Sequence, residues 1–135
     1  MARVYDVGIA ALALDVDRKW LDNLVAQHDV PGVERGGRGV ARRLSIRALV
    51  AAGVARDLQR ELGVAAARAV EIARRVLLAG EHPVLRLSPA LSVHLDVAVA
   101  EREVEARLIH AMETAVPRRR GRPPRDARKA RRGTP

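Results

Sequence analysis

Large aromatic side chains are almost absent from this chain. Its 135 residues include no Phe, one Trp and one Tyr, so Ala, Val and Leu supply most of the apolar content. Because each of these side chains buries little area, a core built from them has to be dense in helices and modest in stability. The absence of cysteine excludes a disulfide framework, a thiolate metal site and a thiol nucleophile.

The positive charge of the chain is concentrated at its C-terminal end. The formal net charge is +9, and residues 117–135 hold nine Lys/Arg against one Asp, a net of +8. Residues 1–116 carry only +1, although residues 33–75 within them carry +6. This distribution predicts one basic face on the body and a separate basic tail that favours nucleic acid. The tail has no Val, Leu, Ile or aromatic residue, so we expect it to be disordered when unbound.

Two short helices joined by a tight turn are predicted near the N-terminus. The apolar run of residues 7–14 is long enough for two helical turns, and Asp17 can cap a second helix over residues 18–27. The periodicity of that second helix places three apolar residues on its inward face, namely Leu21, Leu24 and Val25. This arrangement describes a helix-turn-helix, with Lys19, Asp22 and Asn23 pointing outward.

A basic β-hairpin is predicted next, around the turn Gly36-Gly37. Four arginines lie in it, the composition expected of a DNA-contacting wing: Arg35, Arg38, Arg42 and Arg43. Ser45 can then cap a helix over residues 46–62, which Gly63 would end. A further helix is predicted over residues 66–79, ending at Gly80.

The pattern changes after residue 80. Alternating apolar residues on either side of Pro89 predict two short strands, and residues 97–115 predict a helix with one apolar stripe. The residues of that stripe are Val97, Ala100, Val104, Leu108, Ala111, Met112 and Ala115. Since such a stripe needs a cover, we expect this helix to form a dimer contact.

The order of the predicted elements resembles the MerR-type winged helix-turn-helix domain over residues 4–78. The segments that carry the resemblance are Val7-Gly8-Ile9-Ala10, Val16-Asp17-Arg18, Gly36-Gly37-Arg38-Gly39, Leu44-Ser45 and Arg60-Glu61-Leu62-Gly63-Val64. The resemblance implies a mainly α fold with a small β wing that binds duplex DNA as a homodimer. The second helix, with Arg18, Lys19 and Asn23, would enter the major groove, and the wing would hold the flanking backbone. Three features depart from the family: Asp22 on the groove face, no long coiled coil, and no cysteine for a metal effector.

A second DNA-binding signal lies in the tail, whose Arg-Gly-Arg-Pro sequence resembles the core of an AT-hook. The residues concerned are Arg118, Arg119, Arg120, Gly121, Arg122 and Pro123. An A·T minor groove is narrow and its negative potential attracts Arg, while a glycine lets the backbone approach the groove floor. The alternative is a generic polycation that binds DNA or RNA by counterion release alone.

Other chemistry has little support in the sequence. No two of the four histidines, His28, His82, His94 and His110, are spaced as metal ligands, and no nucleophile elbow or phosphate loop is present. We therefore expect no catalytic residue, metal or cofactor. Trp20 is expected to pack beneath the wing, with base stacking as the alternative. No segment is apolar enough to span a membrane, which favours a cytoplasmic, nucleoid-associated protein.

These observations favour a DNA-binding transcriptional regulator in three parts. Residues 1–80 would form the winged helix-turn-helix, residues 81–116 a strand-plus-helix module for dimerisation or partner binding, and residues 117–135 the basic tail. Two alternatives remain open. One is an antitoxin that captures a toxin through residues 81–116 and represses its own operon. The other is an architectural or excisionase-like protein with weak base preference.

Overall fold

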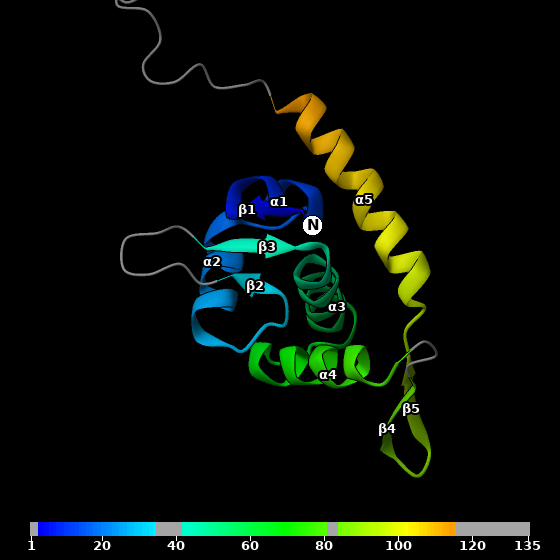
Figure 1. The fold of residues 1–135 in the computed structure, drawn as a ribbon. Helices are drawn as coiled ribbons and strands as arrows, with labels where there is room; N and C mark the ends of the chain where they lie inside the picture. Colours follow the sequence, from blue (N-terminus) through cyan, green and yellow to red (C-terminus); the bar gives the residue numbers. More distant parts are fainter. Residues whose placement is uncertain (1–2, 35–41, 81–83, 116–135) are drawn as a thin grey trace, which may run out of the picture.

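The computed structural model describes residues 3–34, 42–80 and 84–115, and these are mainly helical, as predicted. The helices are α1 (Val7–Leu14), α2 (Arg18–Gln27), α3 (Ile46–Leu62), α4 (Ala66–Leu78) and α5 (Val97–Thr114). The strands are β1 (Val4–Asp6), β2 (Val33–Glu34), β3 (Arg43–Ser45), β4 (Val84–Ser88) and β5 (Leu91–His94). Helix α3 lies at the centre of the fold, and α5 runs along the side opposite α2 (Figure 1).

Two small antiparallel sheets accompany the helices. The first has the strand order β1-β3-β2, with Val33 opposite Leu44 and Glu34 opposite Arg43. This pairing confirms the strands of the predicted hairpin, whose Gly36-Gly37 turn lies outside the described residues. Strand β1 was not predicted, and it adds to the other edge of β3 with Tyr5 opposite Leu44. The second sheet is the β4–β5 hairpin, which confirms the two strands predicted around Pro89.

Short side chains fix most helix starts. Asp6 Oδ1 accepts a hydrogen bond from the Ile9 amide at 2.8 Å, and Ser45 Oγ accepts one from the Ala48 amide at 3.3 Å. Asp96 caps α5 in the same way. Asp17 occupies the predicted N-cap position of α2, but its side chain makes no capping hydrogen bond. The predicted stop of α3 at Gly63 is confirmed, because Gly63 has a φ of 65° and closes the helix with its amide.

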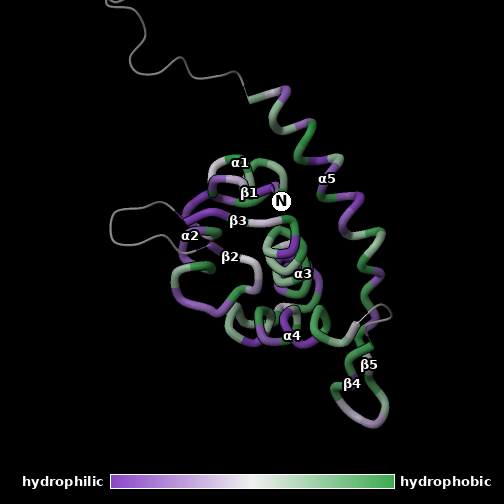
Figure 2. The backbone as a smooth tube through the Cα atoms, in the orientation of Figure 1, coloured by the Kyte–Doolittle hydropathy of each residue, from purple (hydrophilic) through white to green (hydrophobic). Residues whose placement is uncertain are grey.

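The core is aliphatic and continuous. Its largest fully buried side chains come from all five described helices and one strand: Leu14, Leu21, Val25, Leu44, Leu49, Val76 and Leu108. Green and purple alternate along α5 in Figure 2, as expected of a helix with one apolar face. No helix in the described part of the chain has the length and apolar character that a membrane crossing requires.

Helix α5 packs against α1 and α3 of its own chain. Val104, Leu108 and Ala111 are buried there, and they belong to the same core cluster as residues of α1 and α3. The buried part of this stripe is therefore covered by α1 and α3 of the same chain, whereas Val99 and Ile109 on the same helix remain 45% and 57% exposed. Met112, which was assigned to the stripe, is 45% exposed. The homodimer and its contact surface stay predictions.

Candidate nucleic-acid interface

The outward face of α2 holds the residues predicted to contact base edges. Arg18, Lys19 and Asn23 are exposed. Leu21, Leu24 and Val25, on the opposite face of the helix, are at most 2% exposed. The helix is therefore anchored by one side and presents cationic and amide groups on the other, as its periodicity predicts.

Asp22 introduces a negative charge on this face. Its Oδ2 lies 4.0 Å from Arg18 Nε, and the two side chains are 47% and 73% exposed. An ion pair this open contributes roughly 0–1 kcal/mol to stability, so Arg18 can leave Asp22 for a phosphate at little cost. Glu and Asp can also accept a hydrogen bond from the amino group of cytosine, which makes Asp22 compatible with a groove-facing position.

The turn between α1 and α2 is held by two arginines of α3. Arg60 Nη2 donates to the Asp15 carbonyl at 2.6 Å, and Arg56 Nη1 donates to the Leu14 carbonyl. Arg56 also pairs with Asp57 at 2.9 Å, and its side chain is only 13% exposed. These arginines stabilise carbonyls that the end of α1 leaves without intrahelical partners. This role was not predicted from the sequence, where the available signal is the spacing of four residues that places Arg56 and Arg60 on one face of the helix.

Asp15 closes α1 in a conformation that suits glycine. Its φ is 54°, its amide donates to the Leu12 carbonyl at 3.2 Å, and the Val16 amide donates to the Ala11 carbonyl at 3.0 Å. This is the Schellman pattern, in which the left-handed residue is usually glycine. The Arg60 contact uses the backbone of residue 15 and does not depend on its side chain.

We expect Asp15→Gly to raise the free energy of unfolding by about 1 kcal/mol, because glycine adopts positive φ without a steric penalty. Asp17→Gly is the matched control, since Asp17 has a φ of −65° and makes no capping bond. That variant removes the same charge and should lose up to about 0.5 kcal/mol. Urea denaturation measures both, and equal changes in the two variants would contradict this account of the turn.

Trp20 packs as predicted, but against a different element. Its indole Nε1 donates to Gln59 Oε1 at 3.1 Å, and the side chain is partly buried. This contact joins α2 to α3, whereas the sequence analysis placed Trp20 beneath the wing. The Trp20–Gln59 hydrogen bond therefore connects α2 to α3, while Arg56 and Arg60 connect the turn before α2 to the same helix.

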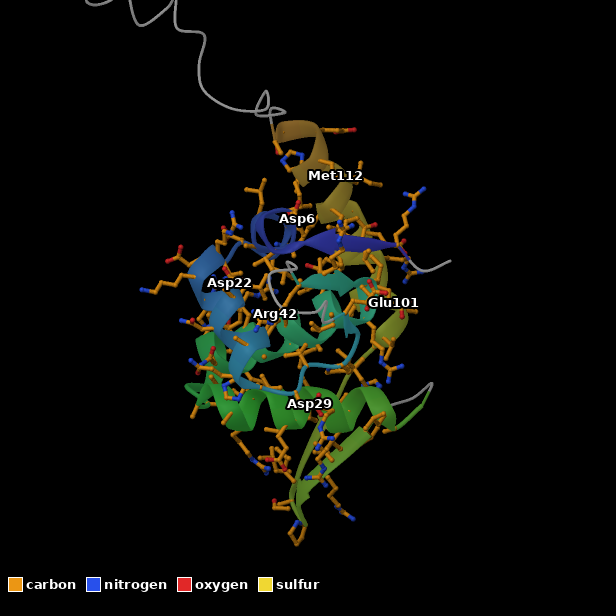
Figure 3. The ribbon with its side chains drawn as sticks, turned by 60° about the vertical axis from the view of Figure 1, so that its left-hand side comes forward. Asp6, Asp22, Asp29, Arg42, Glu101 and Met112 are labelled. Atoms are coloured by element: carbon orange, nitrogen blue, oxygen red, sulfur yellow. The ribbon has the colours of Figure 1, made fainter. Side chains whose placement is uncertain are left out.

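The base of the predicted wing lies on the same side of the fold as α2. Figure 1 shows α2 and the β2–β3 strands on the side away from α5, and in Figure 3 Asp22 and Glu101 lie on opposite sides of the molecule. Arg43 on β3 is exposed, and Arg42 beside it is partly exposed. The other predicted contacts lie outside the described residues: Arg35, Arg38, Arg118, Arg119, Arg120, Gly121, Arg122 and Pro123.

No group of His, Asp and Glu side chains suited to a metal ion occurs within residues 3–34, 42–80 and 84–115. Comparison of the chain with protein-family models, with curated proteins and with solved structures gave no match.

Proposed function

We propose that this protein is a sequence-specific DNA-binding transcriptional regulator of the winged helix-turn-helix type. Helix α2 enters the major groove, Arg42 and Arg43 contact the flanking phosphates, and the tail binds the minor groove of nearby A·T-rich DNA. Two copies read two half-sites, as the two-fold symmetry of operators requires of such dimers.

The observation that carries this proposal is the fixed presentation of α2. A helix that reads bases must be held rigidly by a scaffold while its polar face stays accessible. Here the apolar face is buried, the preceding turn is held by Arg56 and Arg60, and Trp20 is hydrogen-bonded to Gln59. The outward face is left to Arg18, Lys19 and Asn23.

The chemistry of these side chains matches a division between base reading and positioning. Asn23 can pair bidentately with adenine, and Lys19 can donate to the O6 and N7 atoms of guanine. Arg18, Arg42 and Arg43 need only charge and reach to bind phosphates, which positions the helix without reading sequence.

Selection from a random duplex library tests the proposal, and we expect it to return a discrete half-site. On that site Lys19→Ala/Asn23→Ala should weaken binding by at least about 30-fold, because two well-placed base contacts contribute about 1–3 kcal/mol each. Arg102→Ala, on the exposed surface of α5, removes the same charge on the other side of the molecule and serves as the control. A library without preference, or equal losses in both variants, would overturn base reading by α2 and favour the architectural alternative.

A further inference from the structure

The β4–β5 hairpin has two open edges. Among the residues that the structure describes, strands β4 and β5 form a sheet of two, so each strand is paired there along one side only. Figure 1 shows this hairpin extending beyond α4 at the lower end of the fold. An edge strand presents a row of unpaired backbone amides and carbonyls, and two-stranded sheets are only marginally stable by themselves.

The two edges are protected to very different degrees. Strand β4 carries Arg86, has an irregular register between Arg86 and Ser88, and is followed by Pro89, whose carbonyl accepts a hydrogen bond from Arg86 at 3.0 Å. A charge, a bulge and a proline are the features by which natural sheets block edge pairing. Strand β5, with the sequence Leu-Ser-Val-His, has no Lys, Arg, Asp, Glu or Pro, and the irregularity falls on the other strand.

The side chains of β5 are also divided cleanly between the two faces. Val93 lies opposite Leu85, which is 8% exposed, so this face packs toward the core. Ser92 and His94 are exposed on the other face. Leu91, at the free end of the strand, is 57% exposed although it shares the alternation of Val93. A single copy of the protein therefore leaves an apolar side chain at an unprotected edge.

We propose that β5 pairs antiparallel with β5 of a second copy of this chain. A two-fold axis perpendicular to the sheet requires paired residues to lie on the same face, so the axis passes between the two copies of one residue. Centring it on Val93 places Leu91 opposite Leu95 of the partner subunit on the apolar face. On the exposed face it places Ser92 opposite His94 of the partner subunit, and no like charges of Lys, Arg, Asp or Glu oppose each other.

This pairing explains why the assembly would stop at two copies. The combined sheet has the order β4-β5-β5-β4, and both outer edges are then the protected β4 strands, so further strands are not added. It also supplies a dimer contact now that α1 and α3 cover the stripe of α5. Four residues per strand bury much less than the roughly 1,200 Å² of a standard stable interface, so the dimer is weak, with a dissociation constant in the micromolar range or above.

Charged substitutions at Ser92 and His94, which lie opposite each other in the proposed pairing, test it in the absence of DNA. Sedimentation of the full-length chain at pH 7.5, over about 5–500 μM, should show reversible dimerisation of the wild type. Ser92→Lys/His94→Lys brings four lysines together across the two-fold axis and should weaken dimerisation at least about tenfold. Ser92→Lys/His94→Glu places Lys opposite Glu instead and should dimerise at least as well as the wild type.

Both pairs of substitutions fall on exposed positions, so thermal unfolding should show that the variants remain folded. A wild type that stays monomeric throughout the concentration range would overturn the pairing. Equal dimerisation by the two double variants would overturn it too, since the contact would then lie outside the Ser92–His94 register. Neither result bears on base reading by α2, which is measured separately by library selection.

Discussion

Replacing Gly32 with alanine should lower the free energy of unfolding by about 2–4 kcal/mol. Gly32 has a φ of 82°, a conformation that L side chains rarely adopt. A Cβ atom built there would lie 2.3 Å from Ser45 Oγ and 2.9 Å from the Ala48 amide nitrogen. Both distances are far inside van der Waals contact, so the backbone and the cap of α3 must move.

The clash would affect the place where Gly32 contacts the end of β3 and the start of α3. Ser45 Oγ caps α3, and the Ser45 amide donates to the Gly32 carbonyl at 3.1 Å. Loss of such a cap alone costs about 1 kcal/mol. Because Gly32 immediately precedes β2, the same displacement would disturb the strand that leads into the predicted wing. We therefore expect lower stability together with weaker DNA binding.

Gly63→Ala separates the backbone effect from the clash. Gly63 has a φ of 65°, close to that of Gly32, but a Cβ atom there would meet nothing within 4 Å. Its substitution should cost about 1–2 kcal/mol, the penalty of a left-handed non-glycine residue. Urea denaturation of both variants gives the comparison. Similar losses at the two positions would show that the structure around Ser45 relaxes at little cost. The positive φ alone would then account for the loss of stability.

The helices could be predicted because their signals are local. Ser45 and Gly63 bracket α3 as a hydroxyl cap and a left-handed stop, and both roles depend on neighbours within a few residues. The inward face of α2 followed from the spacing of its apolar residues. For the candidate site, this means that exposure of Lys19 and Asn23 could be predicted from periodicity, since burial of one helical face implies exposure of the other.

The missed features depend on contacts between distant parts of the chain. Strand β1 has only three residues, and its pairing with β3 joins Tyr5 to Leu44, which no local pattern indicates. The apolar stripe of α5 indicates that this face of the helix is packed against something, but not against which element. Packing against α1, α3 or another subunit would satisfy the same periodicity. Arg56 and Arg60 looked like surface charges, and their hydrogen bonds to Leu14 and Asp15 cross more than forty positions.

Removing residues 117–135 should strongly lower DNA affinity whatever the base sequence. The segment carries +8 of the formal +9, so its loss leaves a nearly neutral body. Each phosphate contact contributes about 0.9 to the slope of log affinity against log salt, and we expect the slope to fall by about 5. At about 0.1 M salt the affinity should fall roughly 100-fold, since a tethered second site acts at high effective concentration. An unchanged slope in the truncated chain would exclude the tail from the interface.

The choice between a minor-groove contact and a generic polycation depends on Gly121. A polycation binds by charge, so Gly121→Leu, which leaves every arginine in place, should bind A·T- and G·C-flanked duplexes as the wild type does. In a minor-groove complex the leucine side chain would hold the backbone away from the groove floor, and we expect the preference for A·T flanks to fall to about that of the truncated chain. Gly133→Leu, close to the C-terminus and outside the Arg-Gly-Arg-Pro sequence, is the matched control. Because the salt slope should be the same for both leucine variants, a selective loss of A·T preference at Gly121 can be assigned to groove geometry and not to charge.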